Sequence, residues 1–207
     1  MTTKRENINM VKQHLEIERR WLLSGLPGPE ILEALGARFL HYHTLYLCHN
    51  DPEFRLREIT ESSQVRYKMA VKEGEEGEER GETLIEPING SRLFQKNLGK
   101  ELPSVRKTRC KVILPINEGI RIAGEPTWQL VWELDTFFGR LHGISMAEIE
   151  LPRMGFDIQI PQWLEPHILL EVTSYKAFYN KNMAANPQTT LNLVRELIAI
   201  HGTPNPR

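Results

Sequence analysis

Several short segments of the chain alternate charged and apolar residues, which is typical of a β-strand with one polar and one apolar face. Successive side chains of a strand point to opposite faces, so the charged residues of each segment share a face. The charged positions are Glu16, Glu18 and Arg20; Glu53, Arg55 and Arg57; Lys107, Arg109 and Lys111; Glu133 and Asp135; and Glu148 and Glu150. The pattern therefore predicts strands that gather carboxylates and cations on a common surface.

The same periodicity sets the expected strands and their connections. We expect strands over residues 14–23, 39–48, 53–60, 65–72, 82–86, 105–114, 128–137 and 144–151. The turn-forming residues Asn50-Asp51-Pro52 join the second and third strands. The charged run 73–80 is expected to be a solvated hairpin loop, and 115–126 is a long connection for a hairpin.

Helices are expected where proline and glycine mark their ends. They cover residues 27–35, 89–98 and 187–202. Pro29 suits a first helical turn, and Gly36 and Gly99 suit C-terminal caps. In the last helix Leu191 and Val194 fall on one face with Ile198.

Many strands and few helices favour an α+β fold with one antiparallel sheet, curled or closed, in a single domain over residues 1–207. We expect its core at about 14–184, followed by the helix at 187–202. If the charged faces point inward, the apolar faces point outward and need covering helices. A barrel with a polar lumen satisfies both faces.

Composition narrows the possible partners and compartments. The chain has 207 residues, of which 40% are hydrophobic and 26% charged, and a net charge of -1. It therefore lacks the overall basic field of a nucleic-acid-binding protein, and we expect no nucleic-acid partner. Cys48 and Cys110 are too few for a disulfide framework. Without an apolar run of signal or membrane-spanning length, we expect a cytoplasmic protein with no membrane partner, a monomer or a homodimer.

The residue types on the charged faces indicate a metal-assisted phosphate site. Arginine offers a planar fork for phosphate oxygens, and lysine adds a compact positive charge. Carboxylates suit Mg²⁺ or Mn²⁺, which usually share ligands with a substrate phosphate. His41 and His43 share a strand face, but no third ligand follows at a suitable spacing. The chain has no Walker loop, nucleophile elbow or Cys-Xaa-Xaa-Cys pair, so covalent catalysis has no candidate.

An ordered set of these motifs resembles the CYTH family, the triphosphate tunnel metalloenzymes, from about Leu15 to Ala184. The opening Glu16-Ile-Glu18-Arg-Arg20 is similar to the family signature Glu-Xaa-Glu-Xaa-Lys. The later matches are Arg55-Leu-Arg57, Val71-Lys72, Arg80-Gly-Glu82, Lys107-Thr-Arg109, Glu133-Leu-Asp135, Glu148-Ile-Glu150 and Glu171-Val-Thr173, with Lys176 and Asn180 behind. Each motif is short, and their order makes the set specific.

The resemblance implies an antiparallel β-barrel of about eight strands that forms a polar tunnel, with flanking helices. It also implies a triphosphate substrate and a Mg²⁺ or Mn²⁺ cofactor. Glu16, Glu18 and Arg20 are the candidate catalytic residues. Arg55, Arg57, Lys72, Arg80, Lys107, Arg109 and Lys176 are the candidate substrate ligands. Glu16, Glu18, Glu133, Asp135, Glu148 and Glu150 are the candidate metal ligands.

The favoured activity is metal-dependent hydrolysis of a linear triphosphate, foremost inorganic tripolyphosphate, by a metal-activated water. Adenylate cyclase of the class IV type and thiamine triphosphatase are alternatives on the same tunnel. Arg20 stands where the signature has Lys, and Phe178 stands where the family has Tyr, with Tyr179 one position on. Arginine keeps the charge but lacks an easily deprotonated amine, which makes a non-catalytic polyphosphate- or nucleotide-binding module a further alternative. A purely structural protein is the remaining one.

Overall fold

A computed structural model describes residues 17–73, 81–114 and 129–201. Its strands are β1 (Ile17–Leu23), β2 (Arg38–Cys48), β3 (Glu53–Glu61), β4 (Gln64–Glu73), β5 (Gly81–Ile85), β6 (Ser104–Ile113), β7 (Val131–Phe138), β8 (Ser145–Leu151) and β9 (Ile168–Glu171). Its α-helices are α1 (Pro29–Ala34), α2 (Gly90–Leu98), α3 (Asn180–Ala185) and α4 (Pro187–His201). Short 3-10 turns are η2 (Gly139–Leu141), η3 (Glu165–His167) and η4 (Lys176–Phe178).

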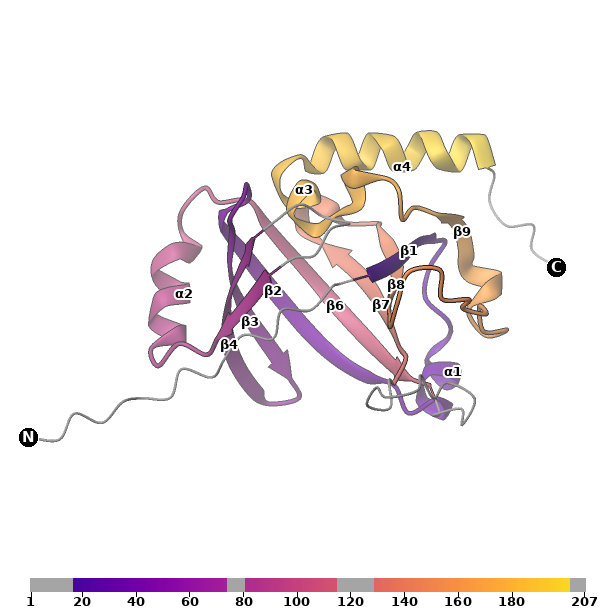
Figure 1. The fold of residues 1–207 in the computed structure, drawn as a ribbon, viewed down its shortest axis with the longest axis horizontal. Helices are drawn as coiled ribbons and strands as arrows, with labels where there is room; N and C mark the ends of the chain where they lie inside the picture. Colours follow the sequence, from indigo (N-terminus) through magenta and orange to yellow (C-terminus); the bar gives the residue numbers. More distant parts are fainter. Residues whose placement is uncertain (1–16, 74–80, 115–128, 202–207) are drawn as a thin grey trace, which may run out of the picture.

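The nine strands form one antiparallel sheet in the order β5-β4-β3-β2-β6-β7-β8-β1-β9. The sheet curves, with α4 above it, α2 beside β4 and α1 at the opposite end (Figure 1). This confirms the α+β class, the antiparallel sheet and the flanking helices. Two details differ from the expected barrel of about eight strands. A ninth strand is present, and within the described ranges no ladder joins the edge strands β5 and β9.

Every strand and helix expected from the sequence has a counterpart. Gly36 follows α1 with a φ of +65°, a backbone conformation that side chains rarely adopt, as its capping position requires. The expected loop at 73–80 lies outside the described residues beyond Glu73, as does the long connection at 115–126. The sequence did not reveal β9, which at four residues is too short to show alternation. None of the helices in the described part of the chain has the length and apolar content to cross a membrane.

The charged strand faces point to the concave side of the sheet, so the apolar faces lie on its convex side. Helices cover these apolar side chains. Trp21 and Trp132 lie with their ring centroids 5.2 Å apart in a cluster that also holds Leu32 of α1. A second cluster joins Leu45 and Leu56 to Phe94 of α2. The helices therefore remove from water the strand faces that do not carry charge.

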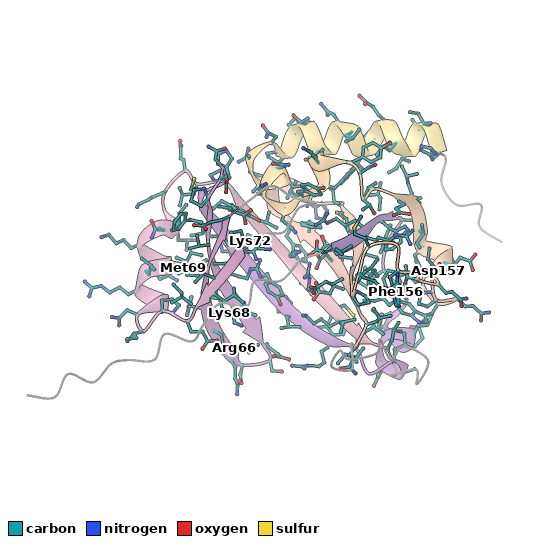
Figure 2. The ribbon with its side chains drawn as sticks, in the orientation of Figure 1. Arg66, Lys68, Met69, Lys72, Phe156 and Asp157 are labelled. Atoms are coloured by element: carbon teal, nitrogen blue, oxygen red, sulfur yellow. The ribbon has the colours of Figure 1, made fainter. Side chains whose placement is uncertain are left out.

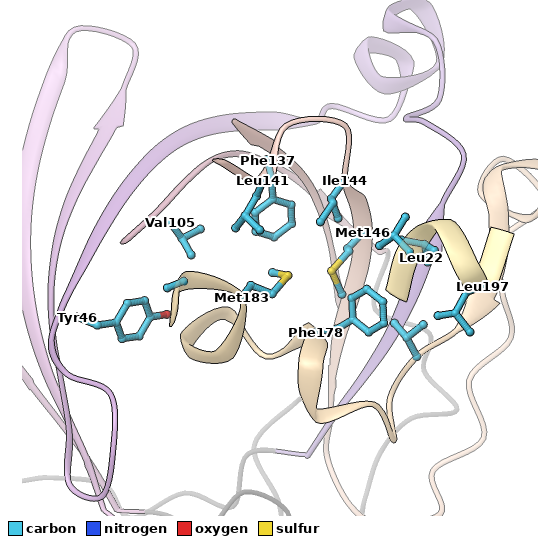
Figure 3. Close-up of a cluster of buried hydrophobic side chains, with 13 residues drawn as sticks. Leu22, Tyr46, Val105, Phe137, Leu141, Ile144, Met146, Phe178, Met183 and Leu197 are labelled. Carbon is cyan, nitrogen blue, oxygen red and sulfur yellow. The ribbon is translucent and has the colours of Figure 1, made fainter. Parts of the chain in front are cut away.

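One part of the concave face is apolar. Leu22, Val105, Phe137 and Met146 each lie two residues from a charged position, and therefore on the same strand face. They pack against η4, α3 and α4, with Phe178, Met183, Val194 and Leu197 in the same cluster (Figure 3). The concave face thus has an apolar region beneath these helices and a charged region beside it.

Replacing Phe94 with alanine tests how much α2 contributes by covering the sheet. Phe94 is 1% exposed and contacts the rings of His43 and Tyr67, at centroid distances of 5.2 and 5.8 Å. We expect Phe94→Ala to lower the free energy of unfolding by about 3–5 kcal/mol, measured by urea denaturation. Leu98→Ala is the matched control, because Leu98 lies in the same helix but is 41% exposed. Equal losses in the two variants would contradict the role given to α2.

Candidate active site

The concave face holds a cavity of about 740 Å³ lined mainly by charged side chains. Its charged lining residues are Glu18, Arg19, Arg20, Glu53, Arg55, Arg57, Lys72, Lys107, Arg109, Glu148, Asp157, Glu171 and Lys181. Lys72 of β4 lies on one side, and Asp157, on the segment after β8, lies on the other (Figure 2). The cavity therefore draws its charges from segments that are far apart in the sequence.

Strand register places acids directly opposite bases on one side of this cavity. Across β1 and β8, Arg20 is the partner of Glu148. Across β6 and β7, Arg109 is the partner of Asp135, and Lys111 is the partner of Glu133. Directly opposed residues of antiparallel strands lie on the same face, so the register alone brings these opposite charges into contact.

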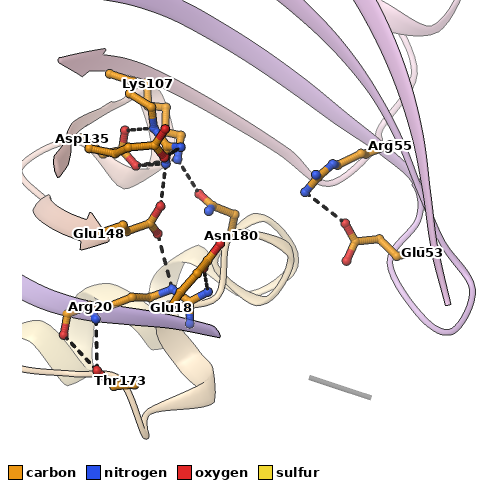
Figure 4. Close-up of polar contacts among 11 residues, drawn as sticks. Glu18, Arg20, Glu53, Arg55, Lys107, Asp135, Glu148, Thr173 and Asn180 are labelled. Carbon is orange, nitrogen blue, oxygen red and sulfur yellow. Dashed lines mark hydrogen bonds and ion pairs between the residues drawn. The ribbon is translucent and has the colours of Figure 1, made fainter. Parts of the chain in front are cut away.

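Arg109 is the centre of a buried ion-pair network on this side of the cavity. Figure 4 shows three other members of the network, Lys107, Asp135 and Glu148. Its Nε donates to Asp135 Oδ1 at 2.7 Å, and its Nη2 donates to Asp135 Oδ2 and to Glu148 Oε2, both at 2.5 Å. Lys107 Nζ donates to Asp135 Oδ2 at 2.5 Å and to Asn180 Oδ1 at 3.2 Å. Because the Asp135 side chain is 0% exposed, these two cations replace its lost hydration.

Arg20 occupies the position of the family's signature lysine and is held in place from several directions. Its guanidinium pairs with Glu18, and its Nε lies 3.4 Å from Glu148 Oε1. The Tyr179 ring lies 4.5 Å from the guanidinium carbon, and the Arg20 backbone N–H donates to Thr173 Oγ1 at 3.0 Å. Arg20 is therefore a fixed cation of the cavity wall.

Burial and neighbouring charges shift the pKa of three members of this network. Burial alone would raise the pKa of Glu148, but Lys107, Arg109 and Arg20 outweigh it and lower that pKa to about 2. Burial opposes the charge of Arg109 as well, yet Asp135 and Glu148 raise its pKa. The pKa of Lys107 is lowered, first by burial and then by Arg109.

The opposite side of the cavity is basic. Arg57 Nε donates to the Thr44 hydroxyl at 3.1 Å, and its guanidinium carbon lies 5.2 Å from the centre of the Tyr42 ring. Burial and the neighbouring guanidinium of Arg55 lower the pKa of Arg57 to about 10. Among residues 17–73, 81–114 and 129–201, no carboxylate pairs with Arg57. An anion entering here would relieve the repulsion between these two arginines.

The predicted site residues fall into three groups. Those that line the cavity are Glu18, Arg20, Arg55, Arg57, Lys72, Lys107, Arg109 and Glu148. Glu133 and Asp135 are ion-pair partners of Arg109 outside the lining, and only Asp135 is fully buried. The described structure places Glu150 and Lys176 outside the lining, and Glu16 and Arg80 lie outside the described residues. His41 and His43 belong to the opposite face of β2, away from the cavity.

Several cavity residues were not among the predicted site residues. Tyr179 enters the cavity, whereas Phe178 is in the apolar core, so the one-residue shift noted in the sequence keeps a tyrosine at the site. Glu53 begins the alternating segment of β3, and its position two residues before Arg55 is the signal that could have identified it. Arg19 pairs with Glu171 at 2.6 Å, but its place in the alternation predicted the opposite face.

The carboxylates of the cavity can be compared with the needs of a divalent cation. In the described part of the chain, no three His, Cys, Asp or Glu residues are grouped to hold a metal ion. Mg²⁺ often takes one or two protein carboxylates and completes its shell with water and substrate phosphate. Glu18 and Glu148 meet that smaller requirement, because both are oxygen donors on the cavity wall.

The lowered pKa of Glu148 predicts a specific loss of stability in acid. The folded carboxylate is protonated near pH 2, and the unfolded one near the ordinary value of 4.5. The ionised carboxylate therefore stabilises the fold above pH 4.5, and this contribution, about 3 kcal/mol, is lost as the pH falls to about 2. Unfolding measured from pH 7 to 2 should show this component in wild-type protein and in Glu196→Gln, an exposed control. Glu148→Gln should lack it, and a profile parallel to wild type would contradict the assignment.

Comparison with known proteins identifies relatives of the chain. No family model matches it. An inorganic triphosphatase of Acetivibrio thermocellus is 27% identical over 173 residues, which is 83% of this chain and 94% of that protein. The crystal structure of the inorganic triphosphatase NE1496 is 26% identical, covers 82% of this chain and 93% of its own, and has a TM-score of 0.48. The PH1819 protein of Pyrococcus horikoshii OT3 is 17% identical, with coverage of 86% and 100% and a TM-score of 0.47.

The resemblance to a family therefore depends on the sequence relative and on the ordered charged motifs. Most of the motif residues that the structure describes line one cavity. The exceptions are Glu133 and Asp135, which pair with Arg109 from outside the lining, and Glu150 and Lys176. The sequence relative and the ordered motifs point to the CYTH family, the triphosphate tunnel metalloenzymes.

Proposed function

We propose that this protein is a metal-dependent hydrolase that cleaves a linear triphosphate, foremost inorganic tripolyphosphate. The observation that carries the proposal is the pair of neighbouring guanidiniums, Arg55 and Arg57, on a cavity wall that faces the carboxylates of Glu18 and Glu148. A bound polyanion would neutralise the basic wall, and the carboxylates of the acidic wall would supply oxygen ligands for a divalent cation. The activity named for the Acetivibrio relative supports the same chemistry.

The basic residues would bind and neutralise the phosphate chain. The fork of a guanidinium matches two phosphate oxygens, and its hydrogen bonds to an anion are charge-assisted. Arg57 is already oriented by Thr44 and Tyr42, so little side-chain entropy remains to be lost on binding. Lys72 adds a further cation to the cavity, and Lys107 and Arg109 line it beside the carboxylates with which they pair.

The acidic residues would hold Mg²⁺ or Mn²⁺ together with the substrate. Glu18 and Glu148 are the cavity carboxylates suited to this, and Glu16 is a further candidate outside the described residues. A bound divalent cation supplies charge neutralisation and lowers the pKa of a coordinated water. Arg20 is paired with Glu18 and Glu148, so in this account it positions those carboxylates and contacts phosphate, rather than accepting a proton.

An organic triphosphate is the second candidate substrate. Leu151, Met154 and Phe156 line the cavity beside Asp157 and supply apolar contacts that an inorganic chain does not use. This favours thiamine triphosphate or a nucleoside triphosphate as alternatives, the latter with either hydrolysis or cyclisation.

A panel of triphosphates assayed with Mg²⁺ and with Mn²⁺ tests the function. We expect tripolyphosphate to yield phosphate and pyrophosphate, and chelation of the metal to stop the reaction. Cyclic nucleotide as the main product would assign a cyclase instead. Tight binding without any product under both metals would assign a non-catalytic module, and the absence of binding would leave a structural protein.

Arg57→Ala tests the basic wall. We expect the affinity for tripolyphosphate, measured by calorimetry, to fall about 10- to 100-fold, because a hydrogen bond to a charged group contributes about 1.5–3 kcal/mol. Arg66→Ala is the matched control: Arg66 lies on neighbouring β4, is 47% exposed and pairs with Glu61 outside the cavity. If the two variants bound tripolyphosphate equally well, Arg57 would not be a ligand.

Glu18→Gln tests the acidic wall. The amide keeps the shape of the side chain but is a weak metal ligand, so kcat should fall at least 100-fold while tripolyphosphate binding changes little. Glu165→Gln, an exposed site on η3, should leave both quantities unchanged. Wild-type turnover by Glu18→Gln at saturating metal would remove Glu18 from the proposed metal site.

A further inference from the structure

Glu53 is a buried carboxylate on the basic side of the cavity. It is the first residue of β3, and alternation places it on the same face as Arg55 and Arg57. It lines the cavity and is 3% exposed. A carboxylate at this position opposes the binding of any anion nearby, so it calls for an explanation beyond the proposed binding of a triphosphate.

Cations from three different elements surround Glu53. Arg55 Nη1 lies 3.5 Å from Glu53 Oε1, and Lys181 Nζ, from α3, lies 4.0 Å from Oε2. Lys72 of β4 is the direct strand partner of Glu53, so its side chain leaves the sheet on the same face. Figure 4 shows Glu53 and Arg55 as a group apart from the network of Glu148 and Lys107.

The three cations around Glu53 form the kind of site that binds a phosphate group, but here a carboxylate lies among them. Two arginine or lysine side chains from strands and one from a helix are the kind of groups that bind a phosphate. They give Glu53 a local field that repels a divalent cation, so a metal-ligand role does not fit. The carboxylate instead supplies, within the protein, the negative charge that one more phosphate would otherwise bring.

We propose that Glu53 is a specificity-determining residue that limits the bound polyphosphate to three phosphates. The inference rests on the proposed function and adds the chain length of the substrate to it. A fourth phosphate would have to approach the Glu53 carboxylate, and repulsion between like charges a few ångströms apart at a partly buried site reduces affinity at least tenfold. A three-phosphate chain bound along Arg109, Lys107 and Arg57, and reaching no further than the Arg55 guanidinium, stops short of the position between Glu53, Lys72 and Lys181.

Calorimetric titration with tripolyphosphate and with tetrapolyphosphate, without metal, tests the proposal. The quantity measured is the ratio of the two affinities. In Glu53→Gln we expect the affinity for tetrapolyphosphate to rise at least tenfold more than that for tripolyphosphate. Glu61→Gln is the matched control: Glu61 lies on the same strand and pairs with Arg38 and Arg66 outside the cavity, so its ratio should equal that of wild type.

The outcomes separate this inference from the proposed function. Wild-type binding of tripolyphosphate with an unchanged ratio in Glu53→Gln would overturn the inference alone, as would an equal loss of both affinities. Wild-type protein that binds neither compound would overturn the proposed function and the inference with it. If Glu53→Gln does not fold, Lys181→Met gives the test, because loss of that ammonium leaves Glu53 less neutralised. Tetrapolyphosphate affinity should then fall more than tripolyphosphate affinity, and equal losses would overturn the inference.

Discussion

The structure depends on the burial of Arg109 between two carboxylates that come from two other strands. Asp135 of β7 and Glu148 of β8 accept from this one guanidinium on β6, so it links the inner faces of three adjacent strands. Removing one member of such a network leaves an unpaired buried charge, which is strongly destabilising. The polar interior is therefore a structural necessity as well as the candidate site.

A sheet with a charged concave face is stable only if its other surfaces provide enough apolar burial. Here the convex face does so under α1 and α2, and the concave face does so where Phe178, Met183 and α4 pack on it. The apolar cluster beneath α3 and α4 lies immediately beside the cavity, since Leu22 follows Arg20 by two residues and Met146 precedes Glu148 by two. Packing of the C-terminal helices thus fixes the strands that carry the site.

Alternation in the sequence was sufficient to predict every strand except β9 and most of the charged residues of the cavity, because strand parity decides which side chains share a face. Strand parity does not predict how deeply a side chain is buried or which residues it contacts. It could not show that Asp135 is fully buried behind Arg109, or that Glu150 lies outside the lining. Short elements escape it as well: β9 and α3 have too few residues for a period, and Tyr179 and Lys181 reach the cavity only through tertiary packing. Arg19 is an exception to strand parity: it lines the cavity together with Glu171, its ion-pair partner.

The central claim is that charged groups from separate strands meet in one cavity that receives a polyphosphate. A crystal structure of the protein with a non-hydrolysable tripolyphosphate analogue tests this most directly. The account predicts phosphate oxygens within hydrogen-bonding distance of the Arg55 and Arg57 guanidiniums, inside the cavity. An analogue bound on the convex face or at the surface of α2, with this cavity left to water, would contradict it.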